Sequence, residues 1–305
     1  MYILVIKQLI TMTIIGVGGF VFAKAFKTNE DERKFLSKLL LYFINPCMVI
    51  NSFNREFDSD KLIQFIFVTI VALLIHGIMI LIGMLSSKEK IDRISVVFTN
   101  CGFIGIPLIR GVFGDECVFY LMGYLVVFNT LVWTYGYYQV SGAISIKKIV
   151  TNPNIIAVVL GIVIFCIPSD LPDFIGRPLG FVADLNTATS MILLGILMAD
   201  FKPGEGILMG RRLIKVNVIR MVLCSIINIA VLFVIYKIFP NIPDIRILVF
   251  VILICSMCPV ATSVPGLACV FNRDAAYASM LVSISSILCI ITLPSFVALA
   301  ENIIK

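Results

Sequence analysis

The stretch "TNCGFIGIPL", residues 99–108, lies in the middle of an apolar segment that is long enough to cross a membrane. Its two glycines and its proline weaken a helix at a depth where unpaired backbone groups are costly. Interrupted backbone is tolerated there only where protein buries it or where it lines a water-filled cavity. The stretch therefore predicts a broken membrane helix at a binding site.

The composition of the whole chain indicates a membrane protein. Of 305 residues, 60% are hydrophobic and 14% are charged, whereas soluble domains average about 25% charged residues. A membrane-spanning helix needs about 20 apolar residues. Ten apolar segments follow one another with short connections, which predicts an all-α polytopic membrane protein with ten transmembrane helices and no water-soluble domain. The segments are 3–26, 35–53, 62–85, 94–113, 117–140, 153–167, 178–200, 213–239, 246–271 and 275–300.

A second interrupted segment, "CSMCPVATSVPGLACVF" at residues 255–271, contains Pro259 and Pro265. Each interrupted segment is the fourth of five, so the chain divides into two similar halves. Because five is an odd number, the second half enters the membrane from the opposite face. We therefore expect two inverted five-helix repeats, 1–140 and 153–305, joined by a cytoplasmic linker, 141–152. Inverted repeats with two discontinuous helices are the architecture of many secondary transporters.

The basic residues predict how the chain is oriented. The loops after the odd-numbered segments carry about twice as many lysines and arginines as the loops on the other side. Cytoplasmic loops carry this excess, so we expect a plasma-membrane protein with both termini outside. The net charge of +6 reflects this asymmetry and does not indicate nucleic-acid binding.

Several classes of function lack their sequence signals. The nine cysteines lie almost all in apolar segments, where they serve as small packing residues. "CSMC" at 255–258 has no second pair or nearby histidine, so neither a metal site nor a disulfide framework is expected. No HExxH motif, nucleophile–base pair or phosphate-binding GxxxxGK[ST] loop occurs. The expected protein is not an enzyme and has no cofactor.

Three stretches resemble the auxin efflux carrier family, which includes plant carriers and many bacterial carboxylate permeases. They are "NCGFIGIPLIRGVFGD" (100–115), "CPVATSVPGLACVFNRDAAYAS" (258–279) and "ITLP" (291–294). The resemblance, to a bacterial member, implies ten helices in two inverted repeats, crossing broken helices 4 and 9, and an organic-anion substrate. The family fold is similar to that of bile-acid symporters and sodium–proton antiporters.

The resemblance also implies where substrate binds. Asn100 stands where the family places a side-chain amide, which could donate hydrogen bonds to a carboxylate. Pro107 and Pro265 match the crossover prolines, and the equivalent of Asn100 in the second half is Cys258, a departure from asparagine. The expected substrate-binding residues are Asn100, Gly102, Gly105, Pro107, Thr262, Ser263 and Pro265.

Ionisable residues inside a membrane are candidates for function. Asp184 is either a proton-carrying carboxylate or a satisfied acid near a helix end. His76, the single histidine, is more often a packing residue in such a position but is a second candidate for coupling. Thr99 is a candidate ligand for a coupling ion. Arg220 is expected to extend to the cytoplasmic interface, with anion binding as its alternative.

The favoured function is a secondary active transporter that moves a small organic carboxylate, such as malate, malonate or an indole acid, by alternating access of the rocking or elevator kind. The transport could be coupled to protons, coupled to sodium, or uncoupled. Membrane lipid is an expected partner, and the sequence leaves a homodimer open. The alternative is a cation–proton antiporter of the same fold. An antiporter would need carboxylates near the crossing, and residues 118–139 contain none. A membrane-embedded enzyme or receptor is the third class.

Overall fold

The computed structural model describes residues 1–143, 147, 150–167, 171–199 and 203–304, and this part of the chain is helical apart from its connections. Seven helical stretches within it are long and apolar enough to cross a membrane. They are Tyr2–Phe26, Glu30–Phe53, Ser59–Ser86, Glu116–Ser141, Asp173–Met198, Gly210–Ile238 and Ala275–Ile303. The expected all-α polytopic fold is confirmed.

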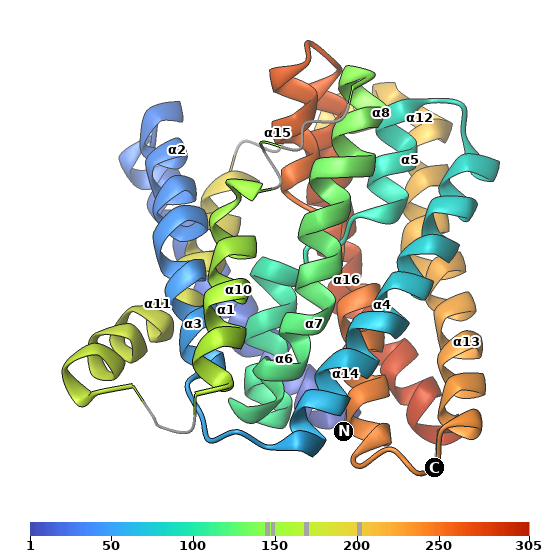
Figure 1. Cartoon of the computed structure of the whole chain (residues 1–305). Helices are drawn as coiled ribbons and strands as arrows, with labels where there is room; N and C mark the ends of the chain where they lie inside the picture. The colour runs from blue at the N-terminus through green and yellow to red at the C-terminus, as the bar shows by residue number, and fades with distance from the viewer. Residues whose placement is uncertain (144–146, 148–149, 168–170, 200–202, 305) are drawn as a thin grey trace.

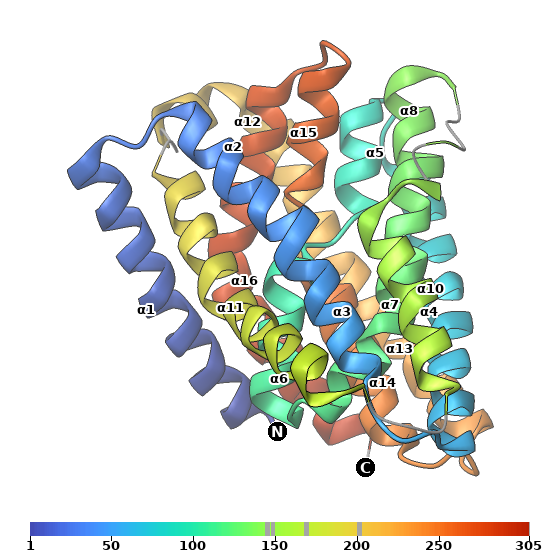
Figure 2. The same ribbon diagram turned by 60° about the vertical axis from the view of Figure 1, so that its left-hand side comes forward.

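The helices form two groups that pack side by side (Figures 1 and 2). The smaller group, called the small bundle, supplies a flank of the molecule. It consists of α1 (Tyr2–Phe26), the continuous run α2 (Glu30–Leu39), η1 (Leu40–Ile44) and α3 (Asn45–Phe53), α10 (Pro153–Phe165) and α11 (Asp173–Met198).

Glycines bring α1 and α11 of the small bundle into close contact. A Cβ atom at Gly195 would clash with the backbone carbonyl oxygen of Gly16, and one at Gly19 would clash with that of Ile192. Small residues at such a seam let two membrane helices approach closely. Farther along α11, the amide of Asn186 donates to Oδ1 of Asn45 at 2.6 Å, which ties α11 to α3.

The second group, called the crossing bundle, contains both interrupted helices. Its first part is α4 (Ser59–Ser86), α5 (Lys90–Val97), η2 (Cys101–Gly105), α6 (Ile106–Phe113), α7 (Glu116–Leu131), η3 (Val132–Gly136) and α8 (Tyr137–Ser141). Its second part is α12 (Pro203–Val218), η4 (Ile219–Leu223), α13 (Cys224–Ile238), α14 (Ile245–Met257), α15 (Ser263–Val270) and α16 (Ala275–Ile303).

Helix α14 runs through the centre of the crossing bundle. Every residue from Leu248 to Met257 is buried. A helix that is apolar all round is expected in a core, where other helices cover it on all sides. Helices α4, α7, α13 and α16 pack around α14.

The two interrupted helices meet where their backbones are extended. Helix α5 ends at Val97 and α14 ends at Met257, and between them Thr99 and Val260 form an antiparallel bridge. The amide of Asn100 donates to the carbonyl of Pro259 at 2.7 Å, and the amide of Ala261 donates to that of Phe98 at 2.9 Å. These bonds satisfy backbone groups that a broken helix leaves unpaired. The expected crossing of the two broken helices is confirmed.

The sixth expected segment, 153–167, is present as the short helix α10. Asn152 caps it, because its Oδ1 accepts hydrogen bonds from the amides of Asn154 and Ile155. With 13 residues α10 is about 20 Å long, less than the roughly 30 Å core of a bilayer. The division into two repeats stays a prediction, and residues 144–146 and 148–149 of the expected linker lie outside the described part of the chain.

Both chain termini lie at the same end of the molecule, which is called the terminal end (Figures 1 and 2). At this end α6 contacts the small bundle on two sides. Nε2 of Gln8 on α1 donates to the carbonyl of Pro107 at 3.0 Å, and Arg110 forms an ion pair with Asp184 of α11 at 3.4 Å. Toward the opposite end α1 diverges from α16 (Figure 2). The described bundles are therefore held together most closely toward the terminal end.

Candidate substrate site at the crossing of the broken helices

The crossing brings together four helix ends of two kinds. Helices α5 and α14 arrive with their C-terminal ends, whose free carbonyls carry partial negative charge. The η2–α6 segment and α15 leave with their N-terminal ends, whose free amides carry partial positive charge. The crossing therefore offers one set of groups to a cation and another set to an anion.

The guanidinium of Arg220 is the cation at the free carbonyls of α5 and α14. Its guanidinium donates to the carbonyl of Val96 at the end of α5 and to the carbonyls of Ser256 and Cys258 at the end of α14. The side chain is 0% exposed, so these bonds form in a low-dielectric interior where charged donors contribute most. One fixed cation thus neutralises the C-terminal ends of both broken helices.

The expectation that Arg220 reaches the membrane interface was wrong. Its position about one and a half turns beyond Lys215 suggested a side chain that extends toward water, but helix position alone does not say which face is buried. The η4 segment turns Arg220 inward, beneath the crossing.

Asn100 lies at the start of the η2 segment and is only 3% exposed. Its backbone is fully used, since its carbonyl accepts from the amides of Ile104 and Gly105. Among the described residues its side-chain Nδ2 has no hydrogen-bond partner. A buried donor without a partner is unfavourable by about 1–3 kcal/mol, so this amide is available to a ligand.

Other predicted residues line the open side of the crossing. Gly102, Thr262, Ser263 and Pro265 are each half-buried, and a Cβ atom at Gly102 would meet no described atom within 4 Å. The hydroxyl of Ser263, at the first position of α15, is buried without a partner in the described structure. Partly exposed predicted residues therefore lie at the N-terminal ends of both second half-helices.

Two predicted residues are placed differently. Gly105 is buried, and a Cβ atom there would lie 3.6 Å from the sulfur atoms of both Cys255 and Cys258, so this glycine serves helix packing. Pro107 lies in the first turn of α6, beyond the extended segment, and its carbonyl accepts the bond from Gln8. The geometry favours packing and positioning roles for these two residues over contact with substrate.

A layer of buried polar groups lies within the crossing bundle. Nδ1 of His76 donates to the carbonyl of Ala72 at 2.8 Å, and its ring packs against that of Tyr124 at a tilt of 47°, with the centroids 4.8 Å apart. Its Nε2, the hydroxyl of Tyr124 and the hydroxyl of Thr99 have no partner in the described part of the chain. His76 and Thr99 therefore stay candidates for coupling.

Asp184 lies apart from these groups, on α11 of the small bundle. Its side chain is 74% exposed and pairs with Arg110. The structure thus places Asp184 at the contact between the bundles and does not bring it to the crossing.

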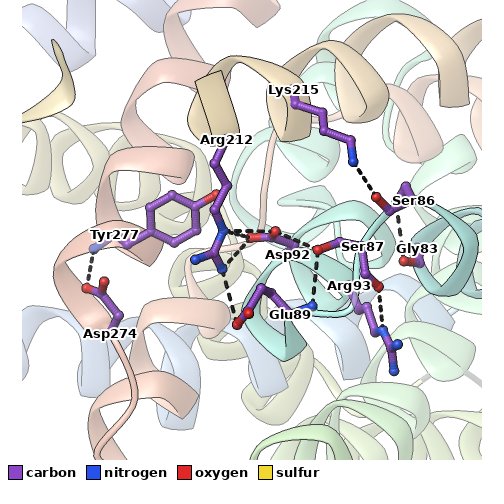
Figure 3. A network of polar contacts seen from close by, with 10 residues as sticks. All are labelled: Gly83, Ser86, Ser87, Glu89, Asp92, Arg93, Arg212, Lys215, Asp274 and Tyr277. Carbon is purple, nitrogen blue, oxygen red and sulfur yellow. Dashed lines mark hydrogen bonds and ion pairs between the residues drawn. The ribbon is translucent and has the colours of Figure 1, made fainter. Parts of the chain in front are cut away.

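A polar network that the sequence did not reveal holds the start of α5 (Figure 3). Asp92 is 2% exposed and receives three hydrogen bonds from the guanidinium of Arg212, at 2.9, 3.0 and 3.1 Å, and one from the hydroxyl of Ser87 at 2.8 Å. The guanidinium carbon of Arg212 lies 4.5 Å from the ring centroid of Tyr277 on α16. Arg212 is 120 residues from Asp92 in the sequence, so no local motif could have indicated the pair.

An all-helical fold with many apolar spans, and with two interrupted helices whose extended backbones pair, defines a multi-pass membrane transporter. The chain belongs to the membrane transport protein family, the auxin efflux carrier family, whose model matches residues 4–143 and 139–297. It is also similar to an uncharacterized transporter of the fission yeast Schizosaccharomyces pombe, at 21% identity over 160 residues. That alignment covers 44% of this chain and 35% of the yeast protein.

Proposed function

We propose that the protein is a secondary active transporter that moves a small organic carboxylate across the plasma membrane. The observation that carries this proposal is the unpaired amide of Asn100, buried where the N-terminal ends of η2–α6 and α15 meet. Helix N-termini and amide donors both favour a carboxylate. Thr262 and Ser263 add hydroxyl groups at the N-terminal end of α15.

The place of Arg220 bears on ion coupling. A sodium ion at the crossing would need oxygen ligands, and the carbonyls of Val96, Ser256 and Cys258 already accept from a guanidinium. A permanent positive charge at these carbonyls makes a bound metal cation unnecessary there. We therefore favour transport that does not require sodium.

Two inverted repeats are part of the proposal, and matching contacts support them. Asp92 at the start of α5 contacts Arg212 on α12, and Arg212 packs on a tyrosine of α16. Asp244 at the start of α14 contacts Gln64 on α4 at 3.4 Å, and Gln64 accepts from Tyr120 of α7 at 2.6 Å. Each broken helix thus has, at its start, an aspartate that contacts a side chain from the third helix of the other half, and that side chain in turn contacts a tyrosine of the fifth helix.

Alternating access would then move the crossing bundle against the small bundle. The substrate groups all lie in the crossing bundle, and the small bundle carries the closely packed α1–α11 seam.

The cation–proton antiporter alternative needs a free carboxylate at the crossing. Of the described carboxylates only Asp92 is buried, and Arg212 already occupies it. This arrangement favours the carboxylate transporter.

Uptake into proteoliposomes tests the proposal. The purified protein is reconstituted, and a panel of labelled carboxylates (malonate, malate, succinate and indole-3-acetate) is offered under imposed proton, sodium or voltage gradients. We expect saturable uptake of at least one carboxylate that does not depend on sodium. Failure of every carboxylate, or exchange of sodium for protons, would refute the proposed substrate class.

Variants of Asn100 link uptake to the site. Asn100→Asp replaces the amide donors with a negative oxygen and should weaken binding by roughly 30- to 150-fold, which corresponds to about 2–3 kcal/mol. Asn100→Ala should weaken it by about tenfold or less, because water can replace the amide. Melting temperature should change little in both. A variant that melts early but binds normally would make Asn100 a structural residue.

A further inference from the structure

We propose that Asp92 and Arg212 are a positioning pair, which holds the crossing in the geometry that binds substrate. The inference rests on the proposed function and extends it to residues at the far end of α5. Helix α5 has only eight residues, so one end cannot move without the other. Its first turn contains Asp92, and its C-terminal end leads directly into Thr99 and Asn100.

One continuous helix holds α5 at both of its ends. Arg212 of α12 binds the Asp92 carboxylate, and Arg220, two turns later, binds the carbonyl of Val96. The α4–α5 turn is held in the same way, because Nζ of Lys215 donates to the carbonyl of Ser86 at 2.6 Å (Figure 3). Three basic residues of this helix therefore hold α5 and the end of α4 that leads into it.

The chemistry of the pair suits positioning more than net stability. The Asp92 carboxylate is buried and the Arg212 side chain is 44% exposed, so desolvation of the carboxylate offsets part of the attraction. The two-pronged geometry of the pair favours one arrangement of the two helices. The Asp92 carboxylate also lies in the first turn of α5, where the helix dipole favours a negative charge. The ring of Tyr277 on α16 packs against the Arg212 guanidinium and restricts its movement. The pair thereby joins α5 to both α12 and α16.

The test compares Asp92→Asn with Glu89→Gln. Glu89 is a matched control, because it is an exposed acid three residues earlier, only 3.7 Å from the same guanidinium. Two measurements are made on the full chain well below its melting temperature. The first is the dissociation constant for labelled malonate. The second is the rate at which N-ethylmaleimide alkylates Cys101, read by mass spectrometry, with Cys117 as the internal control. Both cysteines are buried, and Cys101 adjoins Asn100.

We expect Asp92→Asn to raise the malonate dissociation constant and the Cys101 alkylation rate about tenfold each, with Cys117 unchanged, because a displaced α5 disturbs the crossing alone. Arg212→Lys keeps the positive charge but loses the two-pronged hydrogen bonding of the guanidinium. Its dissociation constant and Cys101 alkylation rate should lie between those of Asp92→Asn and the wild type. Glu89→Gln should match the wild type.

Two results would overturn the inference. The first is that Asp92→Asn and Glu89→Gln have the same dissociation constant for malonate and the same Cys101 alkylation rate. The second is that Asp92→Asn speeds alkylation of Cys101 and Cys117 equally, which would indicate only a lower global stability. If the wild type binds neither malonate nor the other carboxylates while Cys101 alone responds to Asp92→Asn, the positioning pair stands and the proposed substrate class fails.

Discussion

Replacing Arg220 with methionine tests whether this residue holds the crossing together or binds substrate directly. The substitution keeps an unbranched side chain but leaves three buried carbonyls, those of Val96, Ser256 and Cys258, without their donor. Each unsatisfied group is unfavourable by about 1–3 kcal/mol. Removal of a buried cation returns part of this energy, because the guanidinium no longer has to be desolvated.

We therefore expect Arg220→Met to lower the free energy of unfolding by about 3 kcal/mol, the lower end of the sum over three carbonyls. For a chain of this size that corresponds to a melting temperature lower by roughly 6–12 °C. Arg220→Lys keeps a charge without the planar fork, so its loss should be about half as large.

The assay uses the protein's own cysteines. Most of the nine are buried, so a maleimide dye that fluoresces on reaction with thiols reports unfolding during a thermal ramp. Arg211→Met is the control, because Arg211 is an exposed arginine on the same helix. If Arg220→Met melts like the control but loses carboxylate binding, Arg220 is a substrate ligand and the helix-end argument is refuted.

Three further outcomes are expected. Gly195→Ala should lower the melting temperature, because its Cβ meets the backbone of Gly16, whereas Gly180→Ala on the same helix should be neutral or stabilising; equal effects would contradict the glycine seam. Asp184→Asn should change the free energy of unfolding by less than about 1 kcal/mol, since the Asp184 side chain is 74% exposed and Arg110 keeps its pair with Asp115, and should keep any response of uptake to a proton gradient; loss of that response would make Asp184 the proton carrier. A cysteine at the exposed position Asn302 should react with an impermeant reagent outside intact cells, and one at the exposed position Arg211 should not; the reverse would overturn the orientation.

The sequence predicted the parts of the fold that follow from local composition. Hydropathy indicated the spans, because bilayer thickness sets their length. Glycine and proline marked the interrupted helices, because these residues weaken a helix wherever they stand. For the candidate site, the sequence indicated one side-chain amide at a helix break, that of Asn100. These features depend on residues that are neighbours in the chain.

The remaining features depend on partners far away in the sequence. The helix is interrupted at Thr99, before Pro107, because the backbone of Thr99 pairs with that of Val260. No local sequence signal indicates which two residues pair. Arg220 was misread because its three acceptors come from two other helices. Asp92 was not recognised because its partner is in the other half of the chain. Contacts between the halves are what the sequence could not supply.

The attachment of α6 to α1 and α11 implies that the contact between the two bundles at the terminal end should respond to ionic strength from one side of the membrane only. Helix α6, which carries Arg110, lies toward the terminal end (Figure 2), and the carboxylate of its partner Asp184 is mostly exposed. Salt screens exposed pairs over about 10 Å at 0.1 M. Salt added on the side of the termini should weaken this attachment and speed the separation of the bundles there. The same salt on the other side should leave it unchanged, because the bilayer keeps those ions away.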